Sequence, residues 1–133
     1  MTHEFTITKN PNPASEEKLA EVFANPGFGN HFTDHMITIE WNGNYEDGGE
    51  WSNAQVVPYG PLSLDPAAAV FHYGQEIFEG IKAYRHSDGS VYTFRAEENA
   101  RRLNQSARRL ALPELPEELF VEALKQLVAI DER

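Results

Sequence analysis

Four arginines in one short stretch are the residues of this chain best suited to binding a phosphate group. They form two adjacent pairs, Arg101–Arg102 and Arg108–Arg109. A guanidinium presents a fixed fork of donors to phosphate oxygens and stays charged at any working pH. The same spacing also fits the solvated face of an amphipathic helix, so the residue types alone leave a phosphate role open.

Lysine and histidine offer two further kinds of chemistry. Lys82 lies in an extended segment before a turn, and a lysine beside a cofactor pocket can form a Schiff base. The histidines are His3, His31, His35, His72 and His86. His31 and His35 are four residues apart, but their segment is predicted as a loop running into a strand rather than a helix. We therefore predict no metal site.

The charge balance restricts the possible partners. The 133 residues include 11 Lys and Arg against 21 Asp and Glu, and the net charge is -10. This charge would repel nucleic acids and anionic membrane surfaces. The longest apolar run, Ala67–Phe71, is far below the roughly 20 residues of a membrane span, and cysteine is absent. We expect a cytoplasmic protein of about one domain, without nucleic acid or membrane partners.

Local patterns in the first half of the chain predict an arm, two helices and two strands. Ser15 is a helix N-cap followed by acidic residues, and strict alternation of apolar and polar residues from His35 to Trp41 is typical of a strand. In chain order, the predicted elements are a flexible arm over 1–14, a helix from Ser15 to Asn25, strands over 35–41 and 54–58 joined by a polar turn over 42–50, and a short helix over 67–70 opened by Asp65-Pro66.

The second half predicts a hairpin and two helices. Asp88-Gly89 suits a tight turn between strands over 81–85 and 91–94. Apolar residues at three- and four-residue spacing predict helices over 96–112 and 117–130, separated by Pro113. Strands, a hairpin and two helices together favour the α+β class.

Three sequence blocks, in order, carry a resemblance to a known family. They are Phe28–Met36 (FGNHFTDHM), His72–Tyr84 (HYGQEIFEGIKAY), and Phe94–Leu103 (FRAEENARRL) with Ser106-Ala107. Together they resemble branched-chain amino acid aminotransferases, which are class IV, fold-type IV enzymes that use pyridoxal 5'-phosphate. The Phe-Thr-Asp-His-Met part of the first block is similar to the longer subgroup of these enzymes.

The resemblance implies a fold and a division of labour. Residues 15–133 would form the small N-terminal domain of the D-amino acid aminotransferase-like fold, an antiparallel sheet with packed helices, incomplete at its C-terminal end. A large C-terminal domain would follow, with the cofactor between the domains and the intact protein a homodimer. Because the lysine that forms the Schiff base belongs to the large domain, no catalytic residue is expected here, and Lys82 is rejected for that role.

The resemblance also assigns roles to single residues. Arg102 matches the arginine that binds the cofactor phosphate, whereas Arg101 and Arg108 are expected to be solvated. Glu79 is expected to be structural, with Gly80 allowing a close approach of backbone. Aromatic rings of the substrate pocket, which would enclose a branched apolar side chain, are matched by Phe28, Tyr73 and Phe78.

The implied function is transamination of leucine, isoleucine and valine with 2-oxoglutarate by the intact protein, the chain alone being inactive. Two alternatives remain: a non-catalytic small binding or assembly module, and another fold-type IV enzyme such as D-amino acid aminotransferase. The first block argues against the second alternative. The reading frame beyond Arg133 would distinguish between an enzyme fragment and a binding module.

Overall fold

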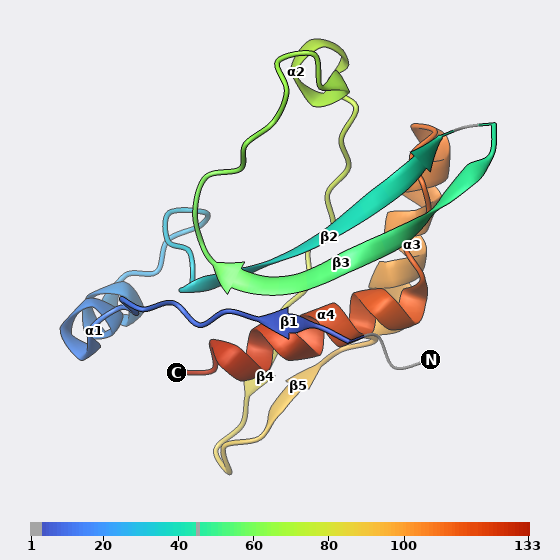
Figure 1. The fold of residues 1–133 in the computed structure, drawn as a ribbon. Coiled ribbons are helices and arrows are strands. Elements are labelled where there is room, and N and C mark those ends of the chain that lie inside the picture. The colour runs from blue at the N-terminus through green and yellow to red at the C-terminus, as the bar shows by residue number, and fades with distance from the viewer. Residues whose placement is uncertain (1–3, 45) are drawn as a thin grey trace. The chain divides into compact units, whose positions relative to one another are not determined.

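The computed structural model describes residues 4–44 and 46–133, so His3 lies outside the described residues. The chain forms two compact units. One holds the described residues up to Pro61 together with Gln126–Arg133, and the other is Leu62–Lys125. Helices accompany small sheets, which confirms the predicted α+β class (Figure 1).

The first unit contains a three-stranded sheet in the order β1-β3-β2. Its strands are β1 (Thr6–Ile7), β2 (His35–Asn44) and β3 (Gly48–Pro58), with β3 in the middle (Figure 1). β2 and β3 are antiparallel, as predicted, but β1 runs parallel to β3. The prediction of a purely antiparallel sheet is therefore wrong for β1.

Part of the predicted arm is bound into this unit. Thr6 and Ile7 form β1, and the Asn10 backbone N–H donates to His35 Nε2 at 2.8 Å. The Ala14 N–H donates to Asp34 Oδ1 at 2.9 Å. This segment thus pairs with the open edge of β3 and contacts side chains at the start of β2, which a reading of local periodicity does not detect.

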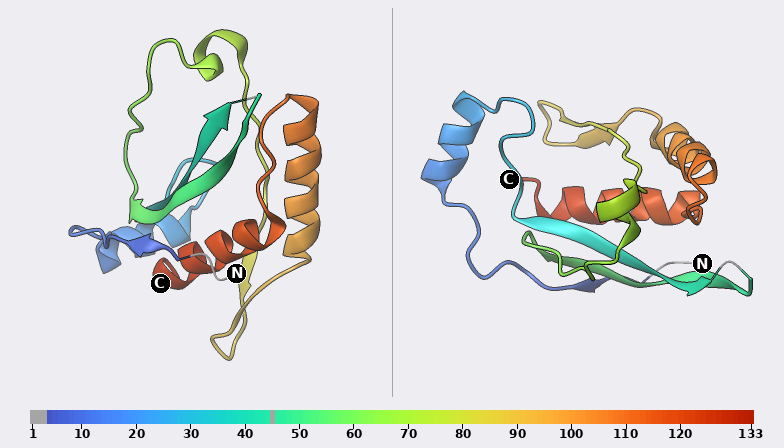
Figure 2. Two further views of the ribbon diagram at one scale, coloured as in Figure 1. Left: turned by 45° about the vertical axis from the view of Figure 1, so that its right-hand side comes forward. Right: turned by 90° about the horizontal axis from the view of Figure 1, so that it is seen from above.

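β2 and β3 extend further than the sequence predicted. They remain paired through the stretch expected to turn, as far as Asn44 and Gly48, and lie side by side in both views of Figure 2. Gly43 and Gly49 explain the extension. A Cβ added at Gly43 would lie 2.4 Å from Gly48 O and from Gly49 Cα, so only glycine lets the two backbones approach here.

Helix α1 (Glu16–Ala24) follows the predicted bounds. Ser15 caps it, because its hydroxyl accepts from the Lys18 backbone N–H at 3.2 Å. The helix stops before Asn25, whose N–H returns to Val22 O. The sequence signals at the two ends, Ser15 and Asn25, were therefore sufficient to predict the bounds of this helix.

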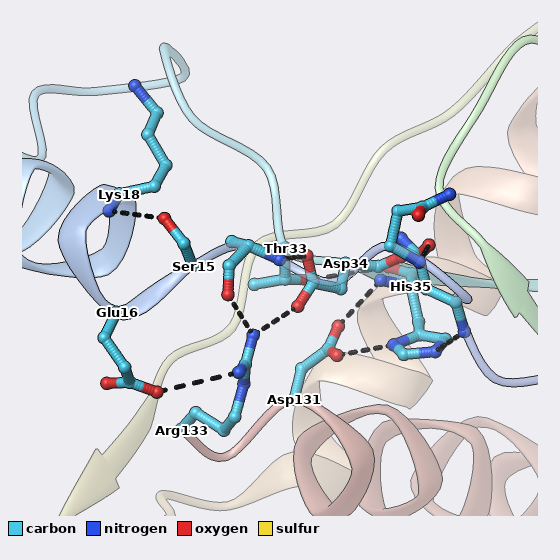
Figure 3. A network of polar contacts seen from close by, with 11 residues as sticks. Ser15, Glu16, Lys18, Thr33, Asp34, His35, Asp131 and Arg133 are labelled. Carbon is cyan, nitrogen blue, oxygen red and sulfur yellow. Dashed lines mark hydrogen bonds and ion pairs between the residues drawn. The ribbon is translucent and has the colours of Figure 1, made fainter.

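A polar network joins the end of the chain to the start of β2 (Figure 3). Asp131 Oδ1 lies 2.7 Å from His35 Nδ1, and Asp131 Oδ2 accepts from the His35 backbone N–H at 3.0 Å. Both side chains are only 7% exposed. Arg133 donates to Asp34 Oδ2 and to Ala14 O, each at 2.9 Å. These contacts fix residues 131–133 in the sheet unit.

The second unit, with α4 reaching past its end, contains the remaining elements: α2 (Ala69–Tyr73), β4 (Ala83–Arg85), β5 (Val91–Thr93), α3 (Ala96–Arg109) and α4 (Glu117–Ile130). The β4–β5 hairpin and α4 confirm the predictions. α2 begins later than predicted, because Asp65 first forms a turn with Ala67 and Ala68. α3 ends three residues early, where Ala111 adopts a left-handed conformation. No helix in residues 4–44 and 46–133 is long and apolar enough to cross a membrane.

The side of α3 that is buried is formed by small residues. Ala96, Ala100 and Ala107 are almost completely buried, as is Leu119 of α4. Asn104 lies in the same stripe, and its amide donates to Leu115 O at 2.8 Å while accepting from Leu115 N–H at 2.9 Å. This side chain therefore satisfies both backbone groups of the residue that leads into α4.

We expect Asn104→Ala to lower the free energy of unfolding of the chain by about 1–3 kcal/mol, because the Leu115 N–H and C=O would lose their partner in a partly buried place. Urea denaturation followed by circular dichroism measures this loss. Gln105→Ala, on the exposed side of the same helix, is the matched control. Equal stability of the two variants would contradict the role given to Asn104.

Candidate functional site

The exposed side of α3 positions Arg102. Glu97 and Glu98 occupy the first turn of the helix, where carboxylates are favoured, and the buried alanines fix which side faces the core. Asn99 and Arg102 are three residues apart and so lie on neighbouring parts of one face. Both side chains meet the segment between α2 and β4, at Glu79.

Arg102 and Glu79 form a two-bond pair. Arg102 Nε donates to Glu79 Oε2 at 2.7 Å, and Arg102 Nη2 donates to Glu79 Oε1. The two partners differ in exposure, since the Glu79 side chain is 5% exposed and that of Arg102 is 64% exposed. The carboxylate is thus the enclosed member of the pair, and the guanidinium reaches solvent.

Further donors surround the Glu79 carboxylate. Its Oε1 also accepts from Asn99 Nδ2 at 3.1 Å and from the Gly80 N–H at 2.9 Å. The Arg102 hydrogen bond is the largest cause that lowers the pKa of Glu79 from 4.5 to about 2, against the opposing effect of burial. A carboxyl with a lowered pKa contributes stability above its unfolded value, here near 4.5, and loses it as the pH falls towards about 2. The pair is therefore fully charged at neutral pH.

Two open hollows lie beside Arg102 in this unit. One, of about 340 Å³, is lined by Glu98, Asn99, Arg101, Arg102 and Gln105. The other, of about 540 Å³, is lined by Arg102 and Phe78 among others, including Arg109 and Ser106. A cation and an exposed aromatic ring on one hollow suit a ligand with an anionic and an apolar part.

The structure brings together two of the four predicted site residues. Arg102 and Phe78 share the larger hollow, whereas Tyr73, the last residue of α2, is exposed and is not among its lining residues. Phe28 belongs to the other unit, where it is almost fully exposed on a hollow of about 600 Å³. The pocket roles of Tyr73, Phe78 and Phe28 remain predictions.

The other arginines of α3 are bound differently from Arg102. Arg101 pairs with Glu98 and lies 3.3 Å from Glu117, and Arg108 pairs with Glu114. All these carboxylates are about half exposed, so the pairs resemble ordinary surface contacts, which contribute little. Arg102 alone among these three pairs with an enclosed carboxylate.

Lysine and histidine side chains form no second candidate functional site among the described residues. Lys82 is exposed and lines neither hollow beside Arg102. His35 is committed to Asp131 and Asn10, and His72 Nε2 lies 2.6 Å from Pro66 O. Residues 4–44 and 46–133 contain no group of three His, Asp or Glu side chains placed to hold a metal ion.

The sequence predicted a structural role for Glu79, and it did not single out Asn99. Glu79 lies in an irregular segment 23 residues before Arg102, so no helical or strand period joins them. The expectation that Gly80 permits a close backbone approach is wrong within the described chain, because a Cβ added there would meet nothing within 4 Å. The Gly80 N–H, rather than its missing side chain, takes part in the site.

Arg102 places a charged donor group beside two open hollows, and such a group can donate hydrogen bonds to an anionic ligand. Comparison with curated proteins identifies relatives of the chain. The chain is 58% identical over 130 residues to a branched-chain-amino-acid aminotransferase of Mycolicibacterium smegmatis, and that match covers 98% of the chain and 34% of the relative. A probable enzyme of this name from Streptomyces coelicolor is 56% identical, over 96% of the chain and 35% of the relative.

A Mycobacterium tuberculosis aminotransferase of the same name is 52% identical over 128 residues, which are 96% of the chain and 34% of the relative. No family model matches the chain. The chain thus spans about a third of the length of the curated relatives it matches. Over nearly its whole length, the chain is homologous to part of the branched-chain amino acid aminotransferases.

Proposed function

We propose that this chain is the N-terminal portion of a branched-chain amino acid aminotransferase, which exchanges the amino group of leucine, isoleucine or valine with 2-oxoglutarate. The observation that carries the proposal is identity of 52–58% to proteins of this name over 96–98% of the chain. Residues 15–133 would be the small domain of the D-amino acid aminotransferase-like fold. We further propose a cytoplasmic homodimer without nucleic acid or membrane partners.

Arg102 fits the phosphate of pyridoxal phosphate, the cofactor proposed here. Two of its donors hold Glu79, and the Nη1 group makes no hydrogen bond to another described residue, so it is available to a phosphate oxygen. When bound, pyridoxal phosphate supplies the electron sink for transamination. This chain's own contribution is to bind the phosphate through Arg102 and to enclose the substrate.

Enclosure of the substrate is the task proposed for the aromatic rings at 28, 73 and 78. Each apolar group that such rings remove from water favours binding, so a branched side chain gains more than the carboxylate of glutamate. Phe78 supports this role because it lies on the same hollow as Arg102. The Schiff-base lysine would belong to a part of the enzyme beyond this chain.

We expect the protein expressed from the whole reading frame to transaminate leucine with 2-oxoglutarate, and the 133-residue chain alone to be inactive. In the intact enzyme, Tyr73→Ala or Phe78→Ala should lower kcat/KM for leucine by about tenfold more than for glutamate, because the rings contact mainly the apolar chain. Steady-state kinetics with both substrates measure the difference. Phe71→Ala, also an exposed ring on α2, is the control.

Two results would contradict these proposals, and they are distinguishable. Lack of leucine transamination by the intact protein would reject the proposed function. Normal transamination with equal losses for leucine and glutamate in Tyr73→Ala and Phe78→Ala would keep the function and reject only the pocket assignment.

A further inference from the structure

The Glu79 carboxylate is an enclosed charge to which the proposed function gives no task. Its side chain is 5% exposed, and its two oxygens accept four hydrogen bonds, from Arg102 Nε, Arg102 Nη2, Asn99 and Gly80. A buried charge is costly unless it is well paired. These four donors therefore keep the Glu79 carboxylate ionised and fixed in position.

The geometry of the guanidinium determines which of its donors remain for a ligand. Arginine has five N–H donors in a rigid plane. Glu79 takes the edge formed by Nε and Nη2, which leaves the Nη1 edge of Arg102 for a ligand. Because the Arg102 side chain is 64% exposed, little else restrains its four flexible torsions. Glu79 therefore determines the direction in which the free edge faces.

The carboxylate is itself held from two sides. Asn99, one helical turn before Arg102, donates to Glu79 Oε1 at 3.1 Å and to Gly80 O at 3.0 Å. The Gly80 N–H donates to the same carboxylate oxygen at 2.9 Å. Asn99 thus ties the segment carrying Glu79 to the helix carrying Arg102, and the Glu79 oxygens cannot rotate away without losing these bonds.

We propose that Glu79 is a positioning residue that orients Arg102 for the cofactor phosphate, with Asn99 fixing Glu79 in turn. This inference rests on the proposed function, since it concerns the same phosphate. It adds a residue that contacts the arginine rather than the cofactor. Pre-ordering a long side chain lowers the entropy cost of binding by an amount equivalent to about two- to tenfold in affinity.

Glu79 can also act against phosphate binding, and the direction in which the cofactor affinity changes on its removal distinguishes this effect from positioning. A carboxylate next to Arg102 also reduces the positive charge that a phosphate meets. If that charge effect dominated, removing the carboxylate would strengthen cofactor binding. If positioning dominates, as we propose, removing it weakens binding.

The experiment uses the intact enzyme, freed of cofactor and titrated with pyridoxal phosphate and, separately, with pyridoxal, which lacks the phosphate. We expect Glu79→Gln to weaken binding of pyridoxal phosphate by about two- to tenfold and to leave pyridoxal binding unchanged. In an Arg102→Ala background, Glu79→Gln should cause no further loss, because its effect passes through Arg102. Glu114→Gln, which removes the half-exposed partner of Arg108, is the matched control.

Asn99→Ala gives a second route should Glu79→Gln fold poorly, and it should weaken pyridoxal phosphate binding in the same selective way. Unchanged or tighter binding of pyridoxal phosphate by the folded variants would overturn the positioning role while leaving the proposed function intact. Equal losses for pyridoxal and pyridoxal phosphate would also overturn it, because they indicate a structural defect. Failure of the unaltered intact enzyme to bind pyridoxal phosphate would reject the proposed function together with this inference.

Discussion

Replacing Arg102 by alanine in the intact enzyme is expected to weaken pyridoxal phosphate binding by about ten- to a hundredfold, because the phosphate would lose hydrogen bonds from a charged donor. Arg102 is the arginine of α3 whose partner, Glu79, is enclosed and whose Nη1 group is left for a ligand. Titration of the cofactor-free enzyme, followed by the absorbance of pyridoxal phosphate, measures the affinity.

Two further variants test whether the loss of cofactor affinity is specific to Arg102 and to its planar fork of donors. Arg108→Ala should leave the affinity within about twofold of the unaltered enzyme, because Arg108 makes a surface pair with Glu114. Arg102→Lys retains the charge but lacks the planar fork, so it should lose most of the affinity. Full affinity in Arg102→Ala would remove Arg102 from the site, and full affinity in Arg102→Lys would show that charge alone is sufficient.

The pH dependence of this effect follows from Glu79. Its pKa of about 2 keeps the carboxylate ionised at every pH above its unfolded value near 4.5, and the Glu79 hydrogen bond also raises the pKa of Arg102. The pair therefore does not titrate near neutral pH. Any change of cofactor affinity in that range should appear equally in the unaltered enzyme and in Glu79→Gln.

Elements defined by local chemistry could be predicted from the sequence. Ser15 caps α1 through its own hydroxyl, Gly89 allows the turn between β4 and β5, and the apolar period of 117–130 gives α4. In each case the interactions that stabilise the element join residues a few positions apart. Arg102 also required the family resemblance, since its pattern within α3 does not distinguish it from Arg101.

Pairings between distant segments could not be predicted in this way. Glu79 and Arg102 are 23 residues apart, and His35 and Asp131 are 96 apart. No period connects such partners, and each of these acidic residues looks like an ordinary surface charge in the sequence. β1 escaped notice for the same reason, because two residues paired in parallel with β3 carry no alternating pattern of their own.

The His35–Asp131 contact joins the end of the chain to the start of β2 (Figure 3). Because His35 Nε2 accepts from the Asn10 N–H, the ring proton lies on Nδ1 and is donated to Asp131. Asp131 also accepts from the His35 backbone N–H, so both its oxygens are used. One carboxylate therefore satisfies two donors of the residue that opens β2.

Asp131→Ala should consequently lower the free energy of unfolding of the chain by about 2–5 kcal/mol, because two hydrogen bonds to a carboxylate are lost and their partly buried donors are left unsatisfied. The variant leaves two donors of His35 without partners at a site where both side chains were 7% exposed. Urea denaturation measures the global loss. Amide hydrogen exchange at the start of β2 should show whether His35 loses protection.

The neighbouring Glu132 provides the control, because it is exposed and shares the local backbone. Glu132→Ala should change the stability by less than about 0.5 kcal/mol, as is usual for surface positions. His35→Ala and the double variant with Asp131→Ala complete a double-mutant cycle, in which the losses should be far from additive. Additive losses, or an Asp131→Ala loss no larger than that of Glu132→Ala, would show that the contact does not hold the end of the chain to β2.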